Sequence, residues 1–462
     1  MSQSRRDFLR GSACALGGMA LVSSLESFGL VDALAQGGAA TDYRALVCVF
    51  LNGGNDCNNL LVSLDQFSSY NSVRNAAGLA IAQPSLLPIS PAGGGSYGLH
   101  PSLPELQTLF GQGRLAVVCN TGPLVEPLTR ATYQNGTGKK PLQLFSHSDQ
   151  VGLWQSSIAN SVAQTGWGGR MADKTGGLNG AANFPQVVTI AGISLFVTGV
   201  TSRPLAIADS GTTLANVLPL TMTGTDSNNS ARRTAFDQIR ALDSNLQLVK
   251  AAADTRAGAL SARTALQSVS PVINTPFPNT PLGRQLLQVA RVIKASTDLS
   301  AGINMKRQIF FCNLGGFDTH SNQIGVQATL LQQLSQAMNS FYLATGELGL
   351  QDKVTTFTLS DFGRTFQPSG TGAGVVGSDH GWGNHHFVLG GAVTGGRLYG
   401  AYPTLALGGP DDTDNRGRWI PTTAVEQYAA TLASWYGLNA SDFPAVFPLI
   451  DRFPSPNLGF MT

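Results

Sequence analysis

Four segments of the chain are continuous apolar runs that break into glycine and polar residues. Their length and their β-branched and aromatic content are typical of strands buried on both faces in a parallel sheet. The four runs are residues 45–56, 114–122, 308–320 and 353–365. We therefore expect the polar residues that close each run to lie at the carboxyl edge of one sheet.

Between these runs lie segments with the apolar spacing of helices. They are residues 101–110, 281–296 and 325–349, and residues 422–438 predict a closing amphipathic helix. Strand and helix alternate, which predicts an α/β fold with a mainly parallel central sheet covered by helices on both faces. Ligands of such sheets bind in the crevice outside the carboxyl ends of the strands.

The stretch from about 135 to 270 has a different pattern. It combines segments rich in Gly, Asn, Thr and Ser with short strand-like pieces and one helical run. We interpret it as an insertion or cap region beside the sheet.

The N-terminus has the features of an export signal. Arg5 and Arg6 precede a short apolar run from about 13 to 22, and Ala33-Leu34-Ala35 forms a small-residue cleavage site. We expect residues 1–35 to be a twin-arginine signal peptide, which makes the twin-arginine translocase a partner during export and the mature protein periplasmic or secreted. The apolar run is shorter than the roughly 20 residues of a membrane-spanning helix, so no stable membrane insertion is expected.

Composition narrows the range of partners. The formal net charge of the 462 residues is +2 and only 12% of them are charged, so nucleic acid is not an expected partner. The cysteines form no CxxC pair. Cys48, Cys119 and Cys312 lie in the apolar runs, where buried free thiols are expected.

Carboxylates and histidines follow the predicted strands. The stretch GSDHGWGNHH, residues 377–386, also holds three of the six histidines of the chain. Side chains of these two kinds suit zinc, manganese, calcium or magnesium. We therefore predict a site for one or two divalent metal ions, with these candidate ligands: Asp56, Asp318, His320, Asp361, Asp379 and His380.

Several motifs also resemble a known family. VFLNGGNDCNNLLV, GGFDTHSNQ, LSDFGRT and GSDHGWGNHHFVLGG are similar to those of the twin-arginine-exported bacterial family called domain of unknown function 1501. That family in turn resembles a branch of the alkaline phosphatase superfamily, which includes phosphatases and sulfatases. The resemblance implies an alkaline-phosphatase-like, three-layer αβα sandwich, usually with two metal ions.

The resemblance assigns roles to some of the candidate ligands. It implies that Asp56 is the first metal-binding aspartate, that Asp318 and His320 share one ion, and that His380 is the last histidine ligand.

One position departs from the superfamily pattern. Asp361 is followed by Phe362, where a histidine is usual, so one expected ligand is absent. Asp379 or His385 would then compensate, or the site would hold a single ion.

The resemblance also suggests a nucleophile. Ser146 lies just before a predicted helix and is the candidate, although a serine there is also a good helix cap.

Arg364 is a candidate clamp for an anionic oxygen, with a structural pairing to Asp361 as the alternative. Cys57 lacks the surrounding sequence required for conversion to formylglycine, which disfavours a sulfatase.

Taken together, the sequence predicts an exported metal-dependent hydrolase. Its substrate would be a small-molecule or polymer-linked anionic ester of phosphate type, or less favourably of sulfate type. The alternatives are a non-catalytic envelope or secreted binding protein on the same fold, and a domain stabilised by calcium, which would use oxygen ligands only.

Overall fold

The computed structural model describes residues 41–462 apart from residue 183, 219–226, 242–246, residue 268, 298–302 and 371–374. The predicted signal peptide, residues 1–35 with Arg5 and Arg6, lies outside the described residues. Among the described residues, no helix is both long enough and apolar enough to cross a bilayer.

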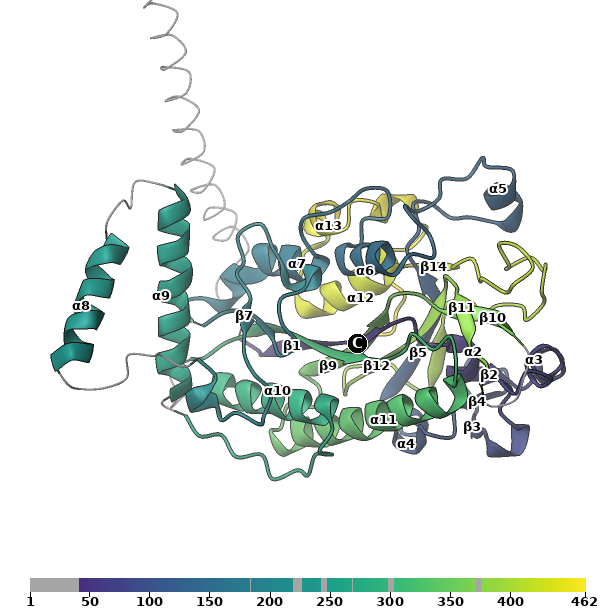
Figure 1. The fold of residues 1–462 in the computed structure, drawn as a ribbon, viewed down its shortest axis with the longest axis horizontal. Helices are drawn as coiled ribbons and strands as arrows, with labels where there is room; N and C mark the ends of the chain where they lie inside the picture. Colours follow the sequence, from purple (N-terminus) through teal and green to yellow (C-terminus); the bar gives the residue numbers. More distant parts are fainter. Residues whose placement is uncertain are drawn as a thin grey trace, which may run out of the picture.

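A mixed, mostly parallel sheet forms the centre of the molecule (Figure 1). Strand β1 lies between β8 and β9 and is parallel to both. The sheet runs in the order β13-β5-β12-β9-β1-β8-β6-β7, and β14 pairs with β5. Its strands are β1 (Arg44–Asn52), β5 (Leu115–Gly122), β6 (Val187–Thr189), β7 (Leu205–Ala206), β8 (Arg307–Gly315), β9 (Val354–Ser360), β12 (Asn384–Leu389), β13 (Arg397–Tyr399) and β14 (Thr423–Ala424). All four predicted strands are present, which confirms the predicted sheet.

Strand β12 is the antiparallel member of the sheet. It pairs antiparallel with both β5 and β9, so its first residue lies at the edge where its neighbours end. The hairpin β10 (Arg364–Pro368) and β11 (Ser378–His380) precedes it. Residues just before β12 are therefore delivered to the carboxyl edge of the parallel strands.

Helices cover both faces of the sheet, as predicted (Figure 1). One layer consists of α4 (Pro104–Gly111), α10 (Pro281–Thr297) and α11 (Gln323–Glu347), and the other of α6 (His147–Ser156), α7 (Trp167–Thr175), α12 (Val425–Tyr436) and α13 (Phe443–Val446). The remaining helices and strands are α2 (Cys57–Leu60), α3 (Phe67–Arg74), α5 (Arg130–Gln134), α8 (Ser227–Ala241), α9 (Gln247–Gln267), β2 (Leu61–Ser63), β3 (Leu87–Ile89) and β4 (Tyr97–Leu99).

The continuous apolar run of β1 is explained by these two layers. Successive side chains of a strand point to opposite faces of the sheet. Val47 and Val49 pack into the core on the α10 and α11 side, whereas Cys48 and Phe50 pack into the core on the α12 side. Both faces are therefore buried, and no polar alternation is left in the sequence. Cys48, Cys57, Cys119 and Cys312 are free and buried, as expected for the three in strands.

The segment predicted as an insertion or cap, about 135–270, divides into two parts. Helices α6 and α7 belong to one helical layer, and β6 pairs with β8 in the central sheet. Helices α8 and α9 stand beside the β7 end of the sheet (Figure 1). The first part thus lies within the main fold and contributes to the site described below.

One buried carboxylate in the α12 layer has no hydrogen-bond partner. Glu426 is fully buried, and neither of its side-chain oxygens accepts a hydrogen bond. Burial raises its pKa from 4.5 to about 8, against the opposing effects of its own backbone N–H and of the Arg170 and Arg452 charges. At neutral pH the folded protein therefore holds Glu426 mostly in its neutral form.

This gives a testable pH dependence. Between pH 4.5 and about 8 the folded state holds the Glu426 proton more tightly than the unfolded state. The free energy of unfolding should therefore fall as the pH rises through this window, by up to about 1.4 kcal/mol per pH unit from this group, and level off above it. In Glu426→Gln this part of the decline should be absent, as measured by urea unfolding at pH 5 to 9. Parallel pH profiles for the two proteins would contradict the assignment.

Candidate metal centre

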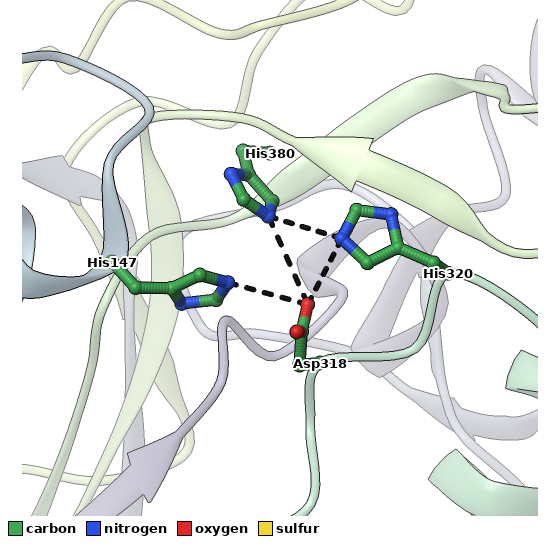
Figure 2. Close-up of side chains that lie close together, drawn as sticks. All are labelled: His147, Asp318, His320 and His380. Carbon is green, nitrogen blue, oxygen red and sulfur yellow. Dashed lines mark hydrogen bonds and ion pairs between the residues drawn. The ribbon is translucent and has the colours of Figure 1, made fainter.

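Four side chains from three separate segments converge at the carboxyl edge of the sheet (Figure 2). They are His147, Asp318, His320 and His380, and are called here the four-residue centre. His147 is the first residue of α6, Asp318 and His320 lie in the loop after β8, and His380 ends β11.

Asp318 Oδ1 lies close to the Nε2 atoms of all three histidines. It is 3.2 Å from His147 Nε2, 3.1 Å from His320 Nε2 and 3.8 Å from His380 Nε2. The Nε2 atoms of His320 and His380 are themselves 3.1 Å apart. Three imidazole nitrogens and one carboxylate oxygen thus face a common point.

The other nitrogen of each imidazole is held by an oxygen atom. His147 Nδ1 lies 2.7 Å from Asp361 Oδ2, His320 Nδ1 lies 3.3 Å from Asp379 Oδ1, and His380 Nδ1 lies 2.7 Å from the Phe145 carbonyl oxygen. An ionised carboxylate and a carbonyl oxygen only accept hydrogen bonds, so each Nδ1 carries the proton.

The Nε2 atoms of the neutral imidazoles then present lone pairs to one another. Two such nitrogens 3.1 Å apart repel unless a proton or a metal ion lies between them. His147 Nε2 is buried and makes no hydrogen bond, although Asp318 Oδ1 is near. This arrangement is the one expected of metal-binding histidines, whose Nδ1–H groups are usually fixed by a carboxylate or a carbonyl.

The spacing of the ligand atoms also fits an ion. Tetrahedral ligands at the usual zinc distances of about 2.0–2.2 Å are separated from one another by about 3.3–3.6 Å. The measured separations of 3.1, 3.2 and 3.8 Å around Asp318 Oδ1 lie near this range. Imidazole suits zinc and other transition metals better than calcium, which prefers oxygen ligands only.

The surroundings shift the pKa values of three of these four side chains. Burial acts to raise the pKa of Asp318, but the Arg364 guanidinium outweighs it and the pKa lies below its ordinary value. The hydrogen bond that His147 Nδ1–H donates to Asp361 raises the pKa of His147 and so makes its other nitrogen more basic. Burial lowers the pKa of His380, which favours the neutral form that a metal requires.

Asp361 and Asp379 lie behind the histidines, outside the four-residue centre. Asp361 is fully buried and accepts a second hydrogen bond, 2.9 Å long, from the Gly53 backbone N–H. Asp379 is paired with the exposed Arg416 guanidinium. The structure thus brings both predicted ligands to the site, where they orient His147 and His320.

Asp56, another predicted ligand, is held in a separate buried network. Its carboxylate is paired with Arg74 and accepts hydrogen bonds from Asn58 N and Nδ2, at 3.1 and 2.9 Å, and from Gln323 Nε2 at 2.5 Å. It also caps the short helix α2. None of its contacts is with the four-residue centre.

Arg364 joins the loops that carry the site. Its buried guanidinium donates to the carbonyl oxygens of Gly53, Gly54, Phe317 and Ser378, and to Asp318 Oδ1 at 2.5 Å. The arginine predicted to clamp a substrate anion is thus engaged with the protein itself. Its carboxylate partner is Asp318, not the alternative Asp361.

Close packing of these loops requires a glycine. Gly53 has φ of +114°, and a Cβ there would lie 2.4 Å from the Asp318 backbone nitrogen. The loop after β1 therefore touches the loop that carries Asp318, and a side chain at residue 53 would separate them.

Ser146, the predicted nucleophile, is turned toward its own helix. Its hydroxyl donates to Asp149 Oδ2 at 2.6 Å and lies 3.3 Å from the Ser148 hydroxyl. The neighbouring His147, which sequence reasoning had not selected, reaches the centre instead. The sequence feature that could have identified His147 is its position in residues 144–150, LFSHSDQ, at the start of a predicted helix.

The remaining histidines of residues 377–386 have a different role. His385 and His386 belong to β12 and are buried. Burial lowers the pKa of His385 to about 4 and that of His386 to about 3. His385 Nδ1 accepts a hydrogen bond from Asn120 N. The suggestion that His385 replaces the missing ligand of Phe362 therefore finds no contact with the centre to support it.

The centre is open to solvent on one side and apolar on another. The side chains of Asp318 and His320 are 51% and 46% exposed. Phe362 is fully buried, and its ring centroid lies 4.7 Å from those of both His147 and His380. Phe362 thus forms a wall against which two of the imidazoles pack.

The chain belongs to the family described as protein of unknown function (DUF1501), whose model matches residues 43–414. No protein of curated function matches it in sequence.

Solved structures with distant similarity of fold include sulfatases and alkaline phosphatases. Ps i-CgsB in complex with k-i-k-neocarrahexaose has a TM-score of 0.35 and 8% identity over 89% of this chain and 77% of its own. The PsFucS1 sulfatase from Pseudoalteromonas sp. has a TM-score of 0.30 and 9% identity over 94% and 74%. A TAB5 alkaline phosphatase mutant with magnesium bound has a TM-score of 0.23 and 11% identity over 75% and 91%.

The geometry predicts a large loss of metal binding when a candidate ligand is replaced and a smaller loss when a residue that orients a ligand is replaced. Asp318→Ala and His380→Ala remove direct ligands and should abolish stoichiometric zinc or manganese binding. Asp361→Asn and Asp379→Asn should keep the site but weaken binding by about 10–100-fold, because they only orient histidines. Isothermal titration calorimetry of the metal-stripped proteins measures the stoichiometry and the dissociation constant for each variant.

Asp352→Asn serves as the control, because it removes an exposed carboxylate that is not part of the four-residue centre. It should bind metal as the parent does. Undiminished binding in both Asp318→Ala and His380→Ala would show that the four-residue centre is not the metal site.

Proposed function

We propose that this protein is an exported, metal-dependent hydrolase of phosphate-type esters, with sulfate esters as the less favoured class. The observation that carries the proposal is the convergence of three Nε2 atoms and Asp318 Oδ1 at a point open to solvent. Four protein ligands already fill a tetrahedral shell, so water or substrate would enter from the exposed side as a fifth ligand, an expansion that catalytic zinc sites undergo.

The substrate class rests on the resemblance of the family to the alkaline phosphatase superfamily, together with the chemistry of the centre. His147, Asp318, His320 and His380 would hold a divalent ion. When bound, such an ion acts as a Lewis acid toward a phosphoryl oxygen and activates water. An anionic ester, either free or linked to a polymer, is the matching substrate.

The residues of the chain supply orientation and proton positions. Asp361 and Asp379 keep the protons of His147 and His320 on Nδ1, so that Nε2 stays free. Arg364 fixes Asp318 between the loops after β1 and β8. Phe362 excludes water from one side of two imidazoles, while the exposed side admits substrate.

Zinc fits this donor set better than calcium or magnesium. Three of the four ligands are imidazoles, whereas calcium and magnesium favour oxygen atoms. The domain stabilised by calcium, considered from the sequence, would leave His320 and His380 without a role. A binding protein that holds metal without turnover is the alternative outcome of the experiment below.

Water is the nucleophile that the geometry favours, because the Ser146 hydroxyl is bonded to Asp149. Ser146→Ala should therefore keep the rate of metal-dependent hydrolysis within about threefold, whereas Asp318→Ala should lose at least about a hundredfold. The measurement is release of nitrophenol from 4-nitrophenyl phosphate and bis(4-nitrophenyl) phosphate by the zinc- and manganese-loaded proteins. Loss of turnover in Ser146→Ala with metal binding intact would make the serine the nucleophile. Metal binding without hydrolysis of phosphate or sulfate esters would favour the binding protein.

Export is tested separately from chemistry. We expect Arg5→Lys/Arg6→Lys to retain the precursor in the cytoplasm, while the parent reaches the periplasm or medium with its first 35 residues removed. Fractionation followed by N-terminal sequencing measures this. A variant exported as efficiently as the parent would contradict a twin-arginine signal.

A further inference from the structure

We infer that the centre binds a single divalent ion, and that the buried ion pair between Arg74 and Asp56 takes the place of a second one. The inference rests on the proposed metal-dependent function and narrows it. It departs from the two-ion site that the resemblance implies, and three observations carry it.

The first observation is that the Asp56 carboxylate is already saturated. Oδ1 accepts from Asn58 N, from Asn58 Nδ2 and, at 3.4 Å, from Arg74 Nη1. Oδ2 is paired with Arg74 Nη2 and accepts from Gln323 Nε2. A carboxylate offers about four lone-pair sites, and five donors already surround this one.

The second observation is that the positive charge beside Asp56 is built into the fold. The side chains of Arg74 and Asp56 are both fully buried. Arg74 is the last residue of α3, which packs against β10 (Figure 1). A charge buried so deeply is retained only with a partner. Arg74 contacts both carboxylate oxygens of Asp56, whereas Arg364 is paired with Asp318 through Oδ1 alone, so the guanidinium stands where an ion at Asp56 would bind.

The third observation is that no alternative ligands are in place. Phe362 occupies the position where the resemblance expects a histidine, and its ring packs against both His147 and His380. Asp361 is committed to His147 and to the Gly53 N–H. Within the described parts of the chain, His147, Asp318, His320 and His380 are the one group of three or more such side chains that could hold an ion.

Arg74 also contributes indirectly to the first ion site. Gln323 donates to Asp56 and accepts a hydrogen bond of 2.5 Å from the Ser378 hydroxyl. The Ser378 carbonyl oxygen accepts from Arg364. Ser378 begins β11, the strand that ends at His380. The Arg74–Asp56 pair therefore supports β11, the strand that carries the candidate ligand His380. Arg74 is thus a positioning residue.

Titration with manganese tests the stoichiometry. The metal-stripped mature protein is loaded with Mn²⁺ up to a large excess and studied by native mass spectrometry and electron paramagnetic resonance. We expect one equivalent per chain and the spectrum of an isolated Mn²⁺ ion. Two equivalents with an exchange-coupled spectrum would overturn this inference and leave the proposed function standing. No bound manganese, and none with zinc, would overturn the proposed function itself.

Substitution of Arg74 tests the role of the cation. Arg74→Met removes the charge and should admit a second, weaker equivalent of Mn²⁺ at Asp56, whereas the control Arg74→Lys should stay at one. A folded Arg74→Met that remains at one equivalent would show that Arg74 does not replace an ion. The wild-type titration decides the stoichiometry even if Arg74→Met does not fold.

Discussion

The site depends on the hydrogen bonds that the buried guanidinium of Arg364 donates. This guanidinium joins carbonyl oxygens from the loop after β1, the loop after β8 and the start of β11, and it holds Asp318 as well. The first two segments meet because β1 and β8 are neighbours in the central sheet, whereas β11 belongs to the separate β10–β11 hairpin. A planar group with five donors can hold several loops at once, which a lysine cannot do. The ligand geometry therefore depends on a side chain that contacts the centre through Asp318 Oδ1.

The carboxylates around the centre divide into two kinds by where their partners lie. Asp318 is half exposed and points into the space shared by the three Nε2 atoms. Asp361 and Asp379 lie behind the imidazoles and accept their Nδ1 protons. Had these two carboxylates ligated an ion directly, two histidines would lack the acceptors that set their tautomers. The arrangement instead gives each imidazole one fixed nitrogen and one free nitrogen.

Much of this architecture could be predicted from the sequence, because the apolar runs of the central strands are long and uninterrupted. The strand-end rule predicted Asp318 and His320 at the edge where the structure has them, whereas His380 was selected from its histidine-rich stretch. It could not separate Asp361 and Asp379 from direct ligands, because that distinction depends on side-chain direction. His147 was not selected because it arrives at the start of a helix and not at the end of a strand.

Two further differences have local causes. His385 and His386 share a glycine-rich stretch with His380, but they lie within the buried strand β12 and pack in the interior. Asp56 follows the first strand as expected, yet its partner Arg74 comes from α3, which a strand-end rule does not consider. The sequence shows that a carboxylate is present at an edge, whereas its charge partner is decided by tertiary packing.

The balance between buried and exposed polar groups indicates how the site works. The supporting residues Asp56, Arg74, Asp361 and Arg364 are almost fully buried, while Asp318 and His320 are about half exposed. A rigid inner layer holding an open outer layer is what a catalytic ion needs, because its ligands must be fixed while one side stays accessible. The same division agrees with the single ion inferred above. In the inner layer Asp56 is paired with Arg74, and Asp361 accepts from His147 Nδ1–H and from the Gly53 N–H, so the free lone pairs lie in the outer layer.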